Sequence, residues 1–399
     1  MASKTNPIKT KTLPDGSTVY WFRVDIGHDP VTGKRKQLYK SFQKLKDAKA
    51  EYSKVTNAVN QGTHVAKTKL TLSAYIDAFL PGHCRDLEEA TKRNYVDALK
   101  PARERLGARE FQSIEKKDVE ALVDWMSTSG RKRGGVVGTG LGPRTIKLTL
   151  NALSLVFDMG VMERKISMNP VSLVKPPKLV KPEHVIWSDA EEDKFFATAA
   201  DDRLSAVIDI FGLGLRPEEV CGLRWTDVKL KSLTIDAGQN VRTWVAGVGA
   251  VEKSAKTAAG VRTLPIDAER GNALRAWRKV QAAEKLAAGP GVYEDGGYVL
   301  CDELGRPFDP PKLRRYMHRL MKSAKVRRVT PYEAMRHAAG SRLARAGVPG
   351  HQIAAWLGHT DPSFTYATYI HARPEDLATA RDALTRASDS SCNSRAIGA

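Results

Sequence analysis

Residues 330–371 read TPYEAMRHAAGSRLARAGVPGHQIAAWLGHTDPSFTYATYIH and bring histidines, tyrosines and arginines together in one short stretch. Its apolar residues recur at helical spacing in two runs, which predicts two helices. Gly347, Pro349 and Gly350 separate the runs and predict a turn between them. Reactive side chains on adjacent helices indicate a functional site. Taken alone, however, the stretch is explained more simply as a helical hairpin with solvated charges.

The composition indicates a polyanionic partner. The 399-residue chain is 42% hydrophobic and 27% charged, which is typical of soluble protein, and its length allows two or three domains. Lys and Arg number 64 against 45 Asp and Glu, a formal net charge of +19. Such a surplus favours a nucleic-acid-binding protein over a small-molecule enzyme.

The sequence predicts a protein of the bacterial cytoplasm that has no membrane partner. No apolar run approaches membrane-spanning length, and the start, MASKTNPIKTKT, lacks the apolar core of a signal peptide. Four cysteines without zinc-ligand spacing predict free thiols: Cys84, Cys221, Cys301 and Cys392. Residues 27–35, GHDPVTGKR, depart from a phosphate-binding loop, so we expect neither a metal nor ATP as cofactor.

Residues 1–62 predict a small DNA-binding domain, a three-stranded sheet plus a helix. Alternating residues at 18–26 and 36–42 indicate strands, and 44–59 has helical periodicity. A ribbon of strands can enter a DNA groove, and the candidate contacts are Lys34, Arg35, Lys36 and Lys40. The alternative is a sheet whose solvated face happens to be basic. The aromatic residues among the charges favour DNA binding.

Residues 67–178 predict an all-helical domain. Helical periodicity recurs at 72–79, 91–99, 117–126 and 145–157. The Gly-rich, basic segment 127–143 is expected to be flexible or ordered by DNA. Candidate DNA-binding residues in and after it are Arg131, Lys132, Arg133, Arg144 and Lys147. A semi-rigid, Pro-containing linker is expected from residue 169 to residue 182.

Residues 183–387 predict a mainly helical domain with a small antiparallel sheet, followed by a flexible tail at 388–399. Ser188 and Glu191 have the spacing of a capping box that opens a helix. Strand-like segments occur at 232–235, 241–245 and 262–266, with Lys253 and Lys256 in the turn before the last of them. The whole chain is therefore predicted to be multidomain and mostly α.

Five short motifs in this third region resemble the catalytic boxes of the tyrosine recombinases, the phage integrase family, in order and in spacing. They are GLR at 214–216, KT at 256–257, RH at 336–337, LGH at 357–359 and YIH at 369–371. One such motif would be a weak signal, whereas five in order are a strong one. The resemblance covers the whole chain and implies a lambda-type integrase with arm-binding, core-binding (SAM-like) and catalytic domains.

The resemblance also implies a role for one residue of each box. These are Tyr369 as nucleophile, Arg216 and Arg336 as phosphate-binding cations, His359 as hydrogen-bond donor to the phosphate, and Lys256 as the acid that protonates the departing 5′ oxygen. The residue types suit this chemistry, because guanidinium forks bind the non-bridging oxygens of a phosphate. A tyrosyl phosphodiester preserves bond energy, so that no ATP is needed.

One box departs from the family pattern. The family usually has histidine three residues before the second arginine, whereas this chain has Glu333 there, with Tyr332 beside it. Residues three and four before Arg336 share its helix face, so both are accessory candidates. Glu219 is a third, because its spacing lets it pair with Arg216.

Three neighbours of the boxes receive lesser roles. His337 is expected to be a buried structural contact, and Tyr366 is expected to pack one turn before the nucleophile. Lys253 remains a rival of Lys256 for the role of general acid.

The resemblance implies a site-specific recombinase that acts on double-stranded DNA at core and arm-type attachment sites. It would form a 3′-phosphotyrosine and a Holliday junction as a homotetramer, with a host DNA-bending protein and an excisionase as further partners. The arm-binding module favours integration and excision of a phage or mobile element, and a helix at 374–387 suits docking on a neighbouring protomer or closing its own domain. The alternatives are a type IB topoisomerase-like enzyme and a non-enzymatic DNA-binding protein with a degenerate site.

Overall fold

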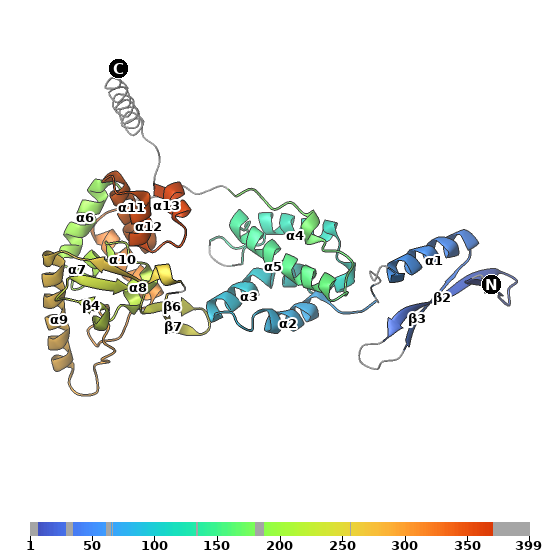
Figure 1. Cartoon of the computed structure of the whole chain (residues 1–399), viewed down its shortest axis with the longest axis horizontal. Helices are drawn as coiled ribbons and strands as arrows, with labels where there is room; N and C mark the ends of the chain where they lie inside the picture. Colours follow the sequence, from blue (N-terminus) through green and yellow to red (C-terminus); the bar gives the residue numbers. More distant parts are fainter. Residues whose placement is uncertain are drawn as a thin grey trace, which may run out of the picture. The chain divides into compact units, whose positions relative to one another are not determined.

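The computed structural model describes residues 7–28, 35–60, 65, 67–132, 135–179, 187–255 and 257–369. The chain divides into two compact units, Met1–Lys181 and Pro182–Ala399 (Figure 1). It is mostly helical, with a small antiparallel sheet near the N-terminus and further small sheets in the second unit. This architecture confirms the predicted fold class.

The N-terminal sheet is covered on one face by a helix. Its strands β1 (Ile8–Thr12), β2 (Thr18–His28) and β3 (Arg35–Phe42) pair antiparallel, and α1 (Leu45–Asn60) follows them. Phe22 and Val24 alternate along β2 and pack with Ala48 and Val55 of α1. The opposite face of the sheet is left open.

The remainder of the first unit has a separate, helical core. It contains α2 (Leu72–His83), α3 (Glu89–Leu106), η1 (Phe111–Ser113), α4 (Lys116–Thr128), α5 (Pro143–Met162) and η2 (Val171–Leu173). Among the described residues, α5 is the one helix long and apolar enough to cross a membrane, by length and composition alone. The apolar stripe is explained by packing, because Leu150, Leu153 and Val156 are buried in the core.

The predicted linker begins too early, because its first residues belong to this helical core. Asn169 donates from Nδ2 to Ser154 Oγ at 2.9 Å and to Asp158 Oδ1 at 2.7 Å, both on α5. Val171 is also buried. The hydrogen bonds of Asn169 to α5 fix the backbone at the start of the predicted linker. The proline content of the segment does not reveal these bonds.

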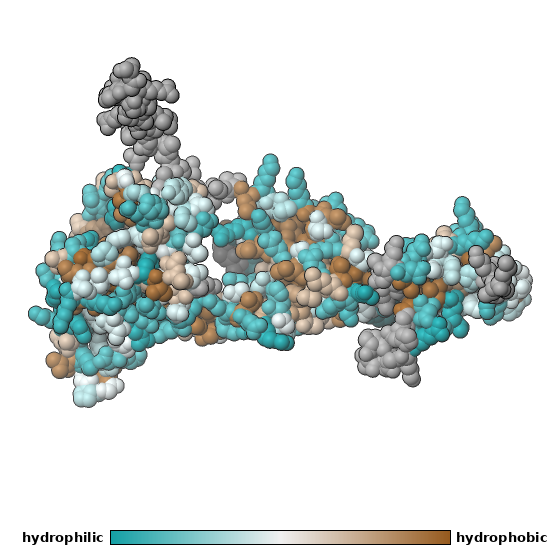
Figure 2. All heavy atoms as spheres, in the orientation of Figure 1, coloured by the Kyte–Doolittle hydropathy of each residue, from teal (hydrophilic) through white to brown (hydrophobic). Residues whose placement is uncertain are grey.

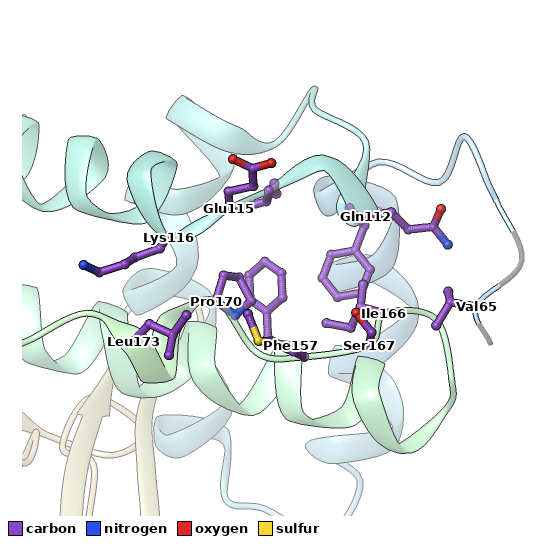
Figure 3. A pocket seen from close by; sticks show the side chains of 12 residues that line it. Val65, Gln112, Glu115, Lys116, Phe157, Ile166, Ser167, Pro170 and Leu173 are labelled. Carbon is purple, nitrogen blue, oxygen red and sulfur yellow. The ribbon is translucent and has the colours of Figure 1, made fainter. Parts of the chain in front are cut away.

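A pocket of about 470 Å³ opens beside the start of α4 (Figure 3). Phe111, Phe157 and Ile166 line it, and Met168 and Leu173 are exposed at its edge. The helical region shows such hydrophobic patches among hydrophilic residues on its visible surface (Figure 2). The pocket walls are mainly apolar, and Lys116, beside Glu115, is the one cation among the described lining residues, so the pocket supplies little of the positive charge that binds a phosphate backbone.

The second unit surrounds small sheets with helices. Its helices are α6 (Asp189–Ala200), α7 (Ser205–Phe211), α8 (Pro217–Gly222), α9 (Ala268–Ala288), α10 (Pro310–Ser323), α11 (Ala338–Arg345), α12 (Gly350–Leu357) and α13 (Pro362–Tyr369). Shorter turns are η3 (Trp225–Asp227), η4 (Ala258–Gly260) and the π-helical η5 (Tyr332–His337). The predicted capping box opens α6, where Ser188 N donates to Glu191 Oε2 at 2.9 Å. In Figure 1, α11, α12 and α13 gather at one end of this unit.

The strands of the second unit differ from the prediction, which had one small sheet and lacked two of the strands. β4 (Val228–Lys229), β5 (Thr234–Ala237) and β8 (Arg262–Pro265) form one sheet, and β6 (Val241–Val245) pairs with β7 (Gly249–Lys253). Lys253 therefore ends a strand, whereas it was expected in a turn. The strand was missed because Gly249–Lys253 has little β-branched or aromatic content, and its pairing with β6 compensates for this.

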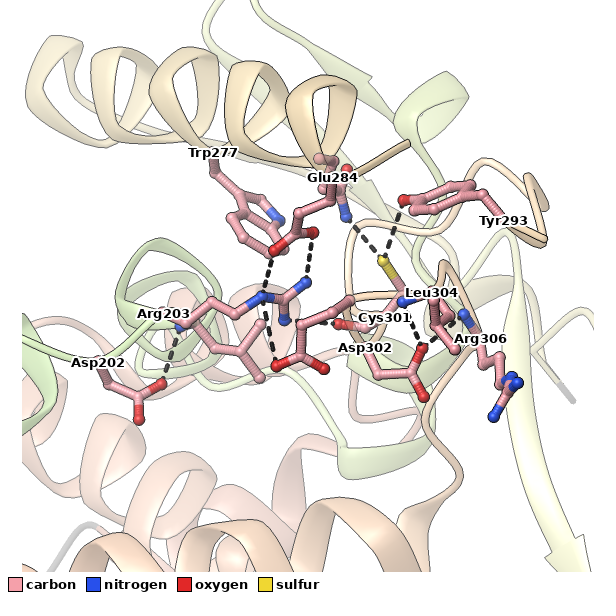
Figure 4. A network of polar contacts seen from close by, with 12 residues as sticks. Asp202, Arg203, Trp277, Glu284, Tyr293, Cys301, Asp302, Leu304 and Arg306 are labelled. Carbon is pink, nitrogen blue, oxygen red and sulfur yellow. Dashed lines mark hydrogen bonds and ion pairs between the residues drawn. The ribbon is translucent and has the colours of Figure 1, made fainter. Parts of the chain in front are cut away.

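The predicted free thiols are confirmed where the structure describes them. Cys84, Cys221 and Cys301 are unpaired and buried, and Cys392 lies outside the described residues. Cys301 belongs to a polar network between α9 and the segment after it (Figure 4). Its sulfur accepts a hydrogen bond from Gln281 Nε2 at 3.0 Å.

The centre of this network is an ion pair. Arg203 donates from Nε and Nη2 to the two carboxylate oxygens of Glu284, at 2.6 Å each, and from Nη1 to the carbonyl of Cys301 at 3.0 Å (Figure 4). Both side chains are largely buried, so each needs the other to offset the loss of water. The pair ties α9 to the loop before α7.

Glu284→Gln should destabilise the second unit by about 2 kcal/mol, because it removes one charge of a bidentate, largely buried pair. Hydrogen–deuterium exchange of the α9 amides in the full chain measures this loss locally. Glu303→Gln is the matched control, since Glu303 lies 3.8 Å from Arg203 and its side chain is 71% exposed. Equal exchange in the two variants would contradict the prediction.

Candidate active site

The first predicted arginine is held at the start of a short helix. Arg216 precedes α8 and donates from Nη1 to Glu219 at 2.6 Å and from Nη2 to the carbonyl of Gly358 at 2.8 Å. Its side chain is 31% exposed, so part of the guanidinium stays accessible to a ligand. Glu219 is thus the predicted partner of Arg216, and Arg216 joins the start of α8 to the box at 357–359.

A third arginine, which the sequence did not indicate, shares that carboxylate. Arg262, on β8, donates to Glu219 at 3.1 and 3.2 Å and to the carbonyl of Trp356 at 2.5 Å. Burial raises the pKa of Glu219, but the charges of Arg262 and Arg216 outweigh burial and leave the pKa below its usual value. The carboxylate is therefore ionised and holds two cations in place.

The second predicted arginine is fully buried. Arg336 Nη1 donates to the carbonyl of Gly214 at 2.9 Å, and Nη2 donates to the carbonyl of Leu357. Its Nε is buried and has no hydrogen-bond partner. Burial, followed by the charge of Arg216, lowers the pKa of Arg336 to about 10, so it remains a cation at neutral pH. Arg216 and Arg336 therefore bind the adjacent carbonyls of Gly358 and Leu357.

The predicted histidine follows this pair of carbonyls. Gly358 ends α12 with φ +67, a left-handed conformation that favours glycine, and turns the chain so that His359 lies part-buried beside the arginines. His359 Nδ1 lies 2.7 Å from Thr365 Oγ1, and its Nε2 is buried without a partner. Burial, followed by the charges of Arg336 and Arg216, lowers its pKa to about 4.

These contacts define the chemistry of His359. The imidazole is neutral at physiological pH, and a Thr365 hydroxyl that donates to Nδ1 leaves the proton on Nε2. An unpartnered Nε2–H can donate a hydrogen bond to a phosphate oxygen, which is the role implied by the resemblance. Thr365 was missed from the sequence, since a threonine within a helix carries no signal of its own.

The predicted nucleophile lies on the same helix as Thr365. Tyr369 is 8% exposed, and its Oη lies 2.8 Å from Nδ1 of His337. The ring packs against α11, where a Cβ on Gly340 would lie 2.6 Å from Cζ of the tyrosine. Burial raises the pKa of Tyr369, the neighbouring Tyr332 adds to this, and the charge of Arg336 opposes it. Its hydroxyl is therefore protonated until a partner takes the proton.

The structure separates the two accessory candidates at the start of η5. The Glu333 carboxylate accepts hydrogen bonds from the amide and hydroxyl of Thr330, at 2.8 Å each, and so caps this turn. Tyr332 instead packs on His337, with ring centroids 4.9 Å apart, and its ring lies 5.9 Å from Arg336 Cζ. A π-helical turn, with its i to i+5 hydrogen bonds, places residues five apart on one face and so brings Tyr332 beside His337.

The predicted general acid, Lys256, lies outside the described residues. The residues on either side of it are described: Ala255 N donates to the carbonyl of Gly238 at 2.9 Å, and Thr257 Oγ1 accepts from Thr360 at 3.3 Å. The segment after Lys256 thus contacts the residue that follows His359. Its rival Lys253 lies on β7.

Two expectations about the neighbouring residues have different outcomes. His337 is buried, as expected, but it contacts the predicted nucleophile directly. Tyr366 was expected to pack, and this was wrong, because it is 46% exposed. α13 buries Thr365 and Tyr369, four residues apart, and Tyr366 lies on its other face.

The predicted DNA-binding residues are placed in different ways, and Lys34 and Arg133 lie outside the described residues. Lys40 lies on the inner face of the sheet and pairs with Glu51 of α1, while Arg35 pairs with Asp25. Lys36 is exposed. Strand pairing shows that the open face carries Trp21 and Tyr39, two of the aromatic residues noted among the charges, and three cations that the sequence did not single out: Lys9, Lys11 and Arg23.

In the helical domain, Arg131 of the basic segment hydrogen-bonds to later residues of the same segment. Arg131 donates to Thr139 Oγ1 at 3.1 Å and to the carbonyl of Gly140 at 2.9 Å, so the described part of the segment is a closed loop. Lys132 pairs with Glu104 at 3.0 Å. Arg144 and Lys147 are exposed on the first turns of α5. These two are the better placed of the predicted cations for contact with DNA.

Thr365→Val should slow DNA cleavage about fivefold. The change removes one hydrogen bond that fixes the tautomer and orientation of His359, and a bond of this kind is worth about 1 kcal/mol. The measurement is the single-turnover rate of covalent adduct formation. Thr365→Ser keeps the hydroxyl and is the control; a Val variant as fast as the Ser variant would sink the idea.

Comparisons with known proteins match the region of the chain that contains these residues. The sequence model of the phage integrase family matches residues 191–376. A tyrosine recombinase XerC-like protein of Caldanaerobacter subterraneus subsp. tengcongensis is 28% identical over 96% of this chain and 99% of its own length.

Two solved structures have the same fold. The Tn1549 transposon integrase, in complex with a circular intermediate DNA, covers 79% of this chain and 99% of its own with a TM-score of 0.62 at 21% identity. The lambda integrase tetramer bound to a Holliday junction covers 94% of this chain and 99% of its own with a TM-score of 0.51 at 17% identity. The family match identifies the region that carries the predicted site: residues 191–376 are a domain of the phage integrase family of tyrosine recombinases.

Proposed function

We propose that the chain is a site-specific DNA recombinase that cleaves and rejoins double-stranded DNA through a 3′-phosphotyrosine and a Holliday junction. The observation that carries this proposal is the pair of guanidiniums on adjacent carbonyls, Arg216 on Gly358 and Arg336 on Leu357, next to His359. Cations that converge beside a hydroxyl nucleophile suit the charge that develops on a phosphate in the transition state. The proposed biological outcome is integration and excision of a phage or mobile element.

The proposed reaction conserves bond energy. Tyr369 Oη attacks the scissile phosphorus and loses its proton, an O–P bond forms, and the bond from phosphorus to the 5′ oxygen breaks. Arg216 and Arg336 stabilise the charge on the non-bridging oxygens, and His359 donates to one of them from Nε2. Lys256 gives a proton to the departing 5′ oxygen. The 5′ hydroxyl of a partner strand then attacks the phosphotyrosine and reverses these steps.

We assign the regions of the chain as follows: 1–62 binds arm-type sites, 67–178 binds core sites, 183–387 performs the chemistry, and 388–399 is a tail. The open sheet face supports the first assignment, because Trp21 and Tyr39 lie 5.3 Å apart with Lys9 over Trp21 at 5.4 Å. Arg144 and Lys147 support the second. The lambda integrase tetramer bound to a Holliday junction supports a homotetramer on DNA. We propose that this assembly acts in the cytoplasm, with a host DNA-bending protein and an excisionase as further partners.

The decisive experiment selects the DNA sequence that the protein cleaves from a random pool. The full chain is incubated with nicked duplexes that carry a random central sequence; cleavage releases a short strand and traps the covalent adduct. Adducts are recovered, their DNA is sequenced, and the modified peptide is identified by mass spectrometry. The proposal predicts a 3′-phosphate joined to Tyr369 and one enriched sequence, and an absence of any adduct would refute it.

Further assays with the selected sequence separate the alternative functions. A type IB topoisomerase-like enzyme would relax a supercoiled plasmid carrying the selected sequence and give no joint molecules between two such plasmids. A non-enzymatic DNA-binding protein would retain duplexes without any covalent link. The motif residues argue against a degenerate site, because Arg216 and Arg336 bind the adjacent carbonyls that precede His359, and the His359 and Tyr369 side chains each have a hydrogen-bond partner.

A further inference from the structure

The hydroxyl of Tyr369 is in direct contact with one titratable side chain. Its Oη lies 2.8 Å from Nδ1 of His337, and both residues are buried, at 8% and 3% exposure. A buried tyrosine cannot release its proton to bulk water during the reaction, so the proton needs an acceptor inside the protein. Imidazole nitrogen is the commonest acceptor in such roles.

Two other possible proton acceptors, Glu333 and His359, have hydrogen-bond partners of their own. The Glu333 carboxylate caps the turn at Thr330. The Nδ1 of His359 is taken by Thr365, at 2.7 Å, and its neighbouring arginines make it a poor base. Among the described residues, His337 is therefore the one basic group hydrogen-bonded to Oη.

The surroundings of His337 fix its orientation. Tyr332 packs edge-on to the imidazole from its own turn, with ring centroids 4.9 Å apart. Tyr369 lies against it from α13, with ring centroids 5.7 Å apart, and Gly340 of α11 leaves room for that ring. His359, after α12, is a titratable group close enough for its pKa to be lowered by His337. The π-helical turn is what places Nδ1 at the tyrosine.

We infer that His337 is a further catalytic residue, which accepts the phenolic proton of Tyr369 as the O–P bond forms; the inference rests on Tyr369 being the nucleophile proposed above. The electron pair of the O–H bond becomes the nucleophilic pair, and the proton moves to Nδ1. The leaving 5′ oxygen receives a separate proton from Lys256. In the reverse step His337 returns its proton to the tyrosine oxygen, so the residue ends as it began.

The test compares variants that position the hydroxyl with variants that can also take its proton. His337→Asn places an amide oxygen near the position of Nδ1, so it can hold the hydroxyl but not accept its proton. We expect it to lower the rate of adduct formation by about 10²–10⁴-fold while DNA binding and the melting temperature change little. Replacing Tyr369 by a difluorotyrosine, whose phenol is more acidic, should restore much of that loss.

Two controls make the result specific to the nucleophile. A substrate with a sulfur at the bridging 5′ position has a leaving group that needs no acid, so it should rescue Lys256→Ala and not His337→Asn. If the Asn variant does not fold, the unaltered chain provides the measurement: a solvent deuterium isotope effect on cleavage of the sulfur substrate should persist, and its loss would overturn the inference.

The outcomes also distinguish this inference from the proposed function. An unaltered chain that forms no adduct refutes the function itself. An unaltered chain that forms the adduct, with a His337→Asn variant that cleaves at the same rate or is not rescued by difluorotyrosine, overturns only the role of His337.

Discussion

Tyr369→Phe is expected to bind the selected DNA normally and to form no covalent adduct. The substitution removes a single oxygen from a side chain whose ring contacts Gly340 and whose hydroxyl contacts His337. Phenylalanine preserves the ring packing, but it has no nucleophile and cannot be bypassed by a general base. Adduct formation should therefore fall below detection, which is the largest effect expected of any single change in this chain.

The same helix offers a matched control. Tyr366 lies one turn before Tyr369 and is 46% exposed, so Tyr366→Phe removes an equivalent hydroxyl from the other face of α13. It should cleave DNA at a rate near that of the unaltered chain. Adduct formation by Tyr369→Phe, or its loss in Tyr366→Phe, would mean that the nucleophile has been assigned to the wrong residue.

The residues of the catalytic boxes were predictable because their chemistry depends on residue type and order. Arg216, Arg336, His359 and Tyr369 each carry a group that few side chains can replace, and their order along the chain survives large changes elsewhere. The contacts between them were not predictable. The sequence does not show that Arg216 and Arg336 bind adjacent carbonyls, because those contacts join segments more than a hundred residues apart in one case, Arg216 to Gly358.

Helical spacing failed at the start of η5. With ordinary α-helical periodicity, Tyr332 and Glu333 are equally close to Arg336 and no choice between them is possible. The π-helical turn adds a residue to that turn, and the capping bonds from Thr330 use the glutamate. Neither feature has a reliable signature in a single sequence. His337 was consequently interpreted as a structural contact, whereas it lies against the tyrosine hydroxyl.

Counting basic residues also overestimated some DNA contacts. Lys40 and Arg131 carry positive charge, but the first pairs with Glu51 and the second closes its own loop. Strand alternation could have identified Lys9 and Arg23 on the open face once the pairing was known, yet the register of three short strands is set by tertiary packing. Charge predicts the class of partner, and the fold decides which cations reach it.

Arg336→Lys is expected to lower the cleavage rate by about 10³-fold, the second largest effect. The guanidinium bridges the carbonyls of Gly214 and Leu357 while fully buried. An ammonium group is a point charge at the end of a flexible chain; it cannot satisfy both carbonyls and also present a flat fork to a phosphate. A carbonyl left without its donor costs about 1–3 kcal/mol, so the melting temperature should fall as well.

A slower Arg336→Lys variant could have lost stability or catalytic chemistry. Arg342→Lys is the control that separates these two effects. Arg342 lies on α11, donates to the carbonyl of Gly212 at 2.6 Å and pairs with Glu192, so Arg342→Lys removes a comparable fork outside the site. Its melting temperature should fall by less than that of Arg336→Lys, because the Arg342 side chain is 41% exposed, with cleavage at folded temperatures close to that of the unaltered chain. Equal cleavage by the two variants would assign Arg336 a structural role and leave Arg216 as the phosphate-binding arginine.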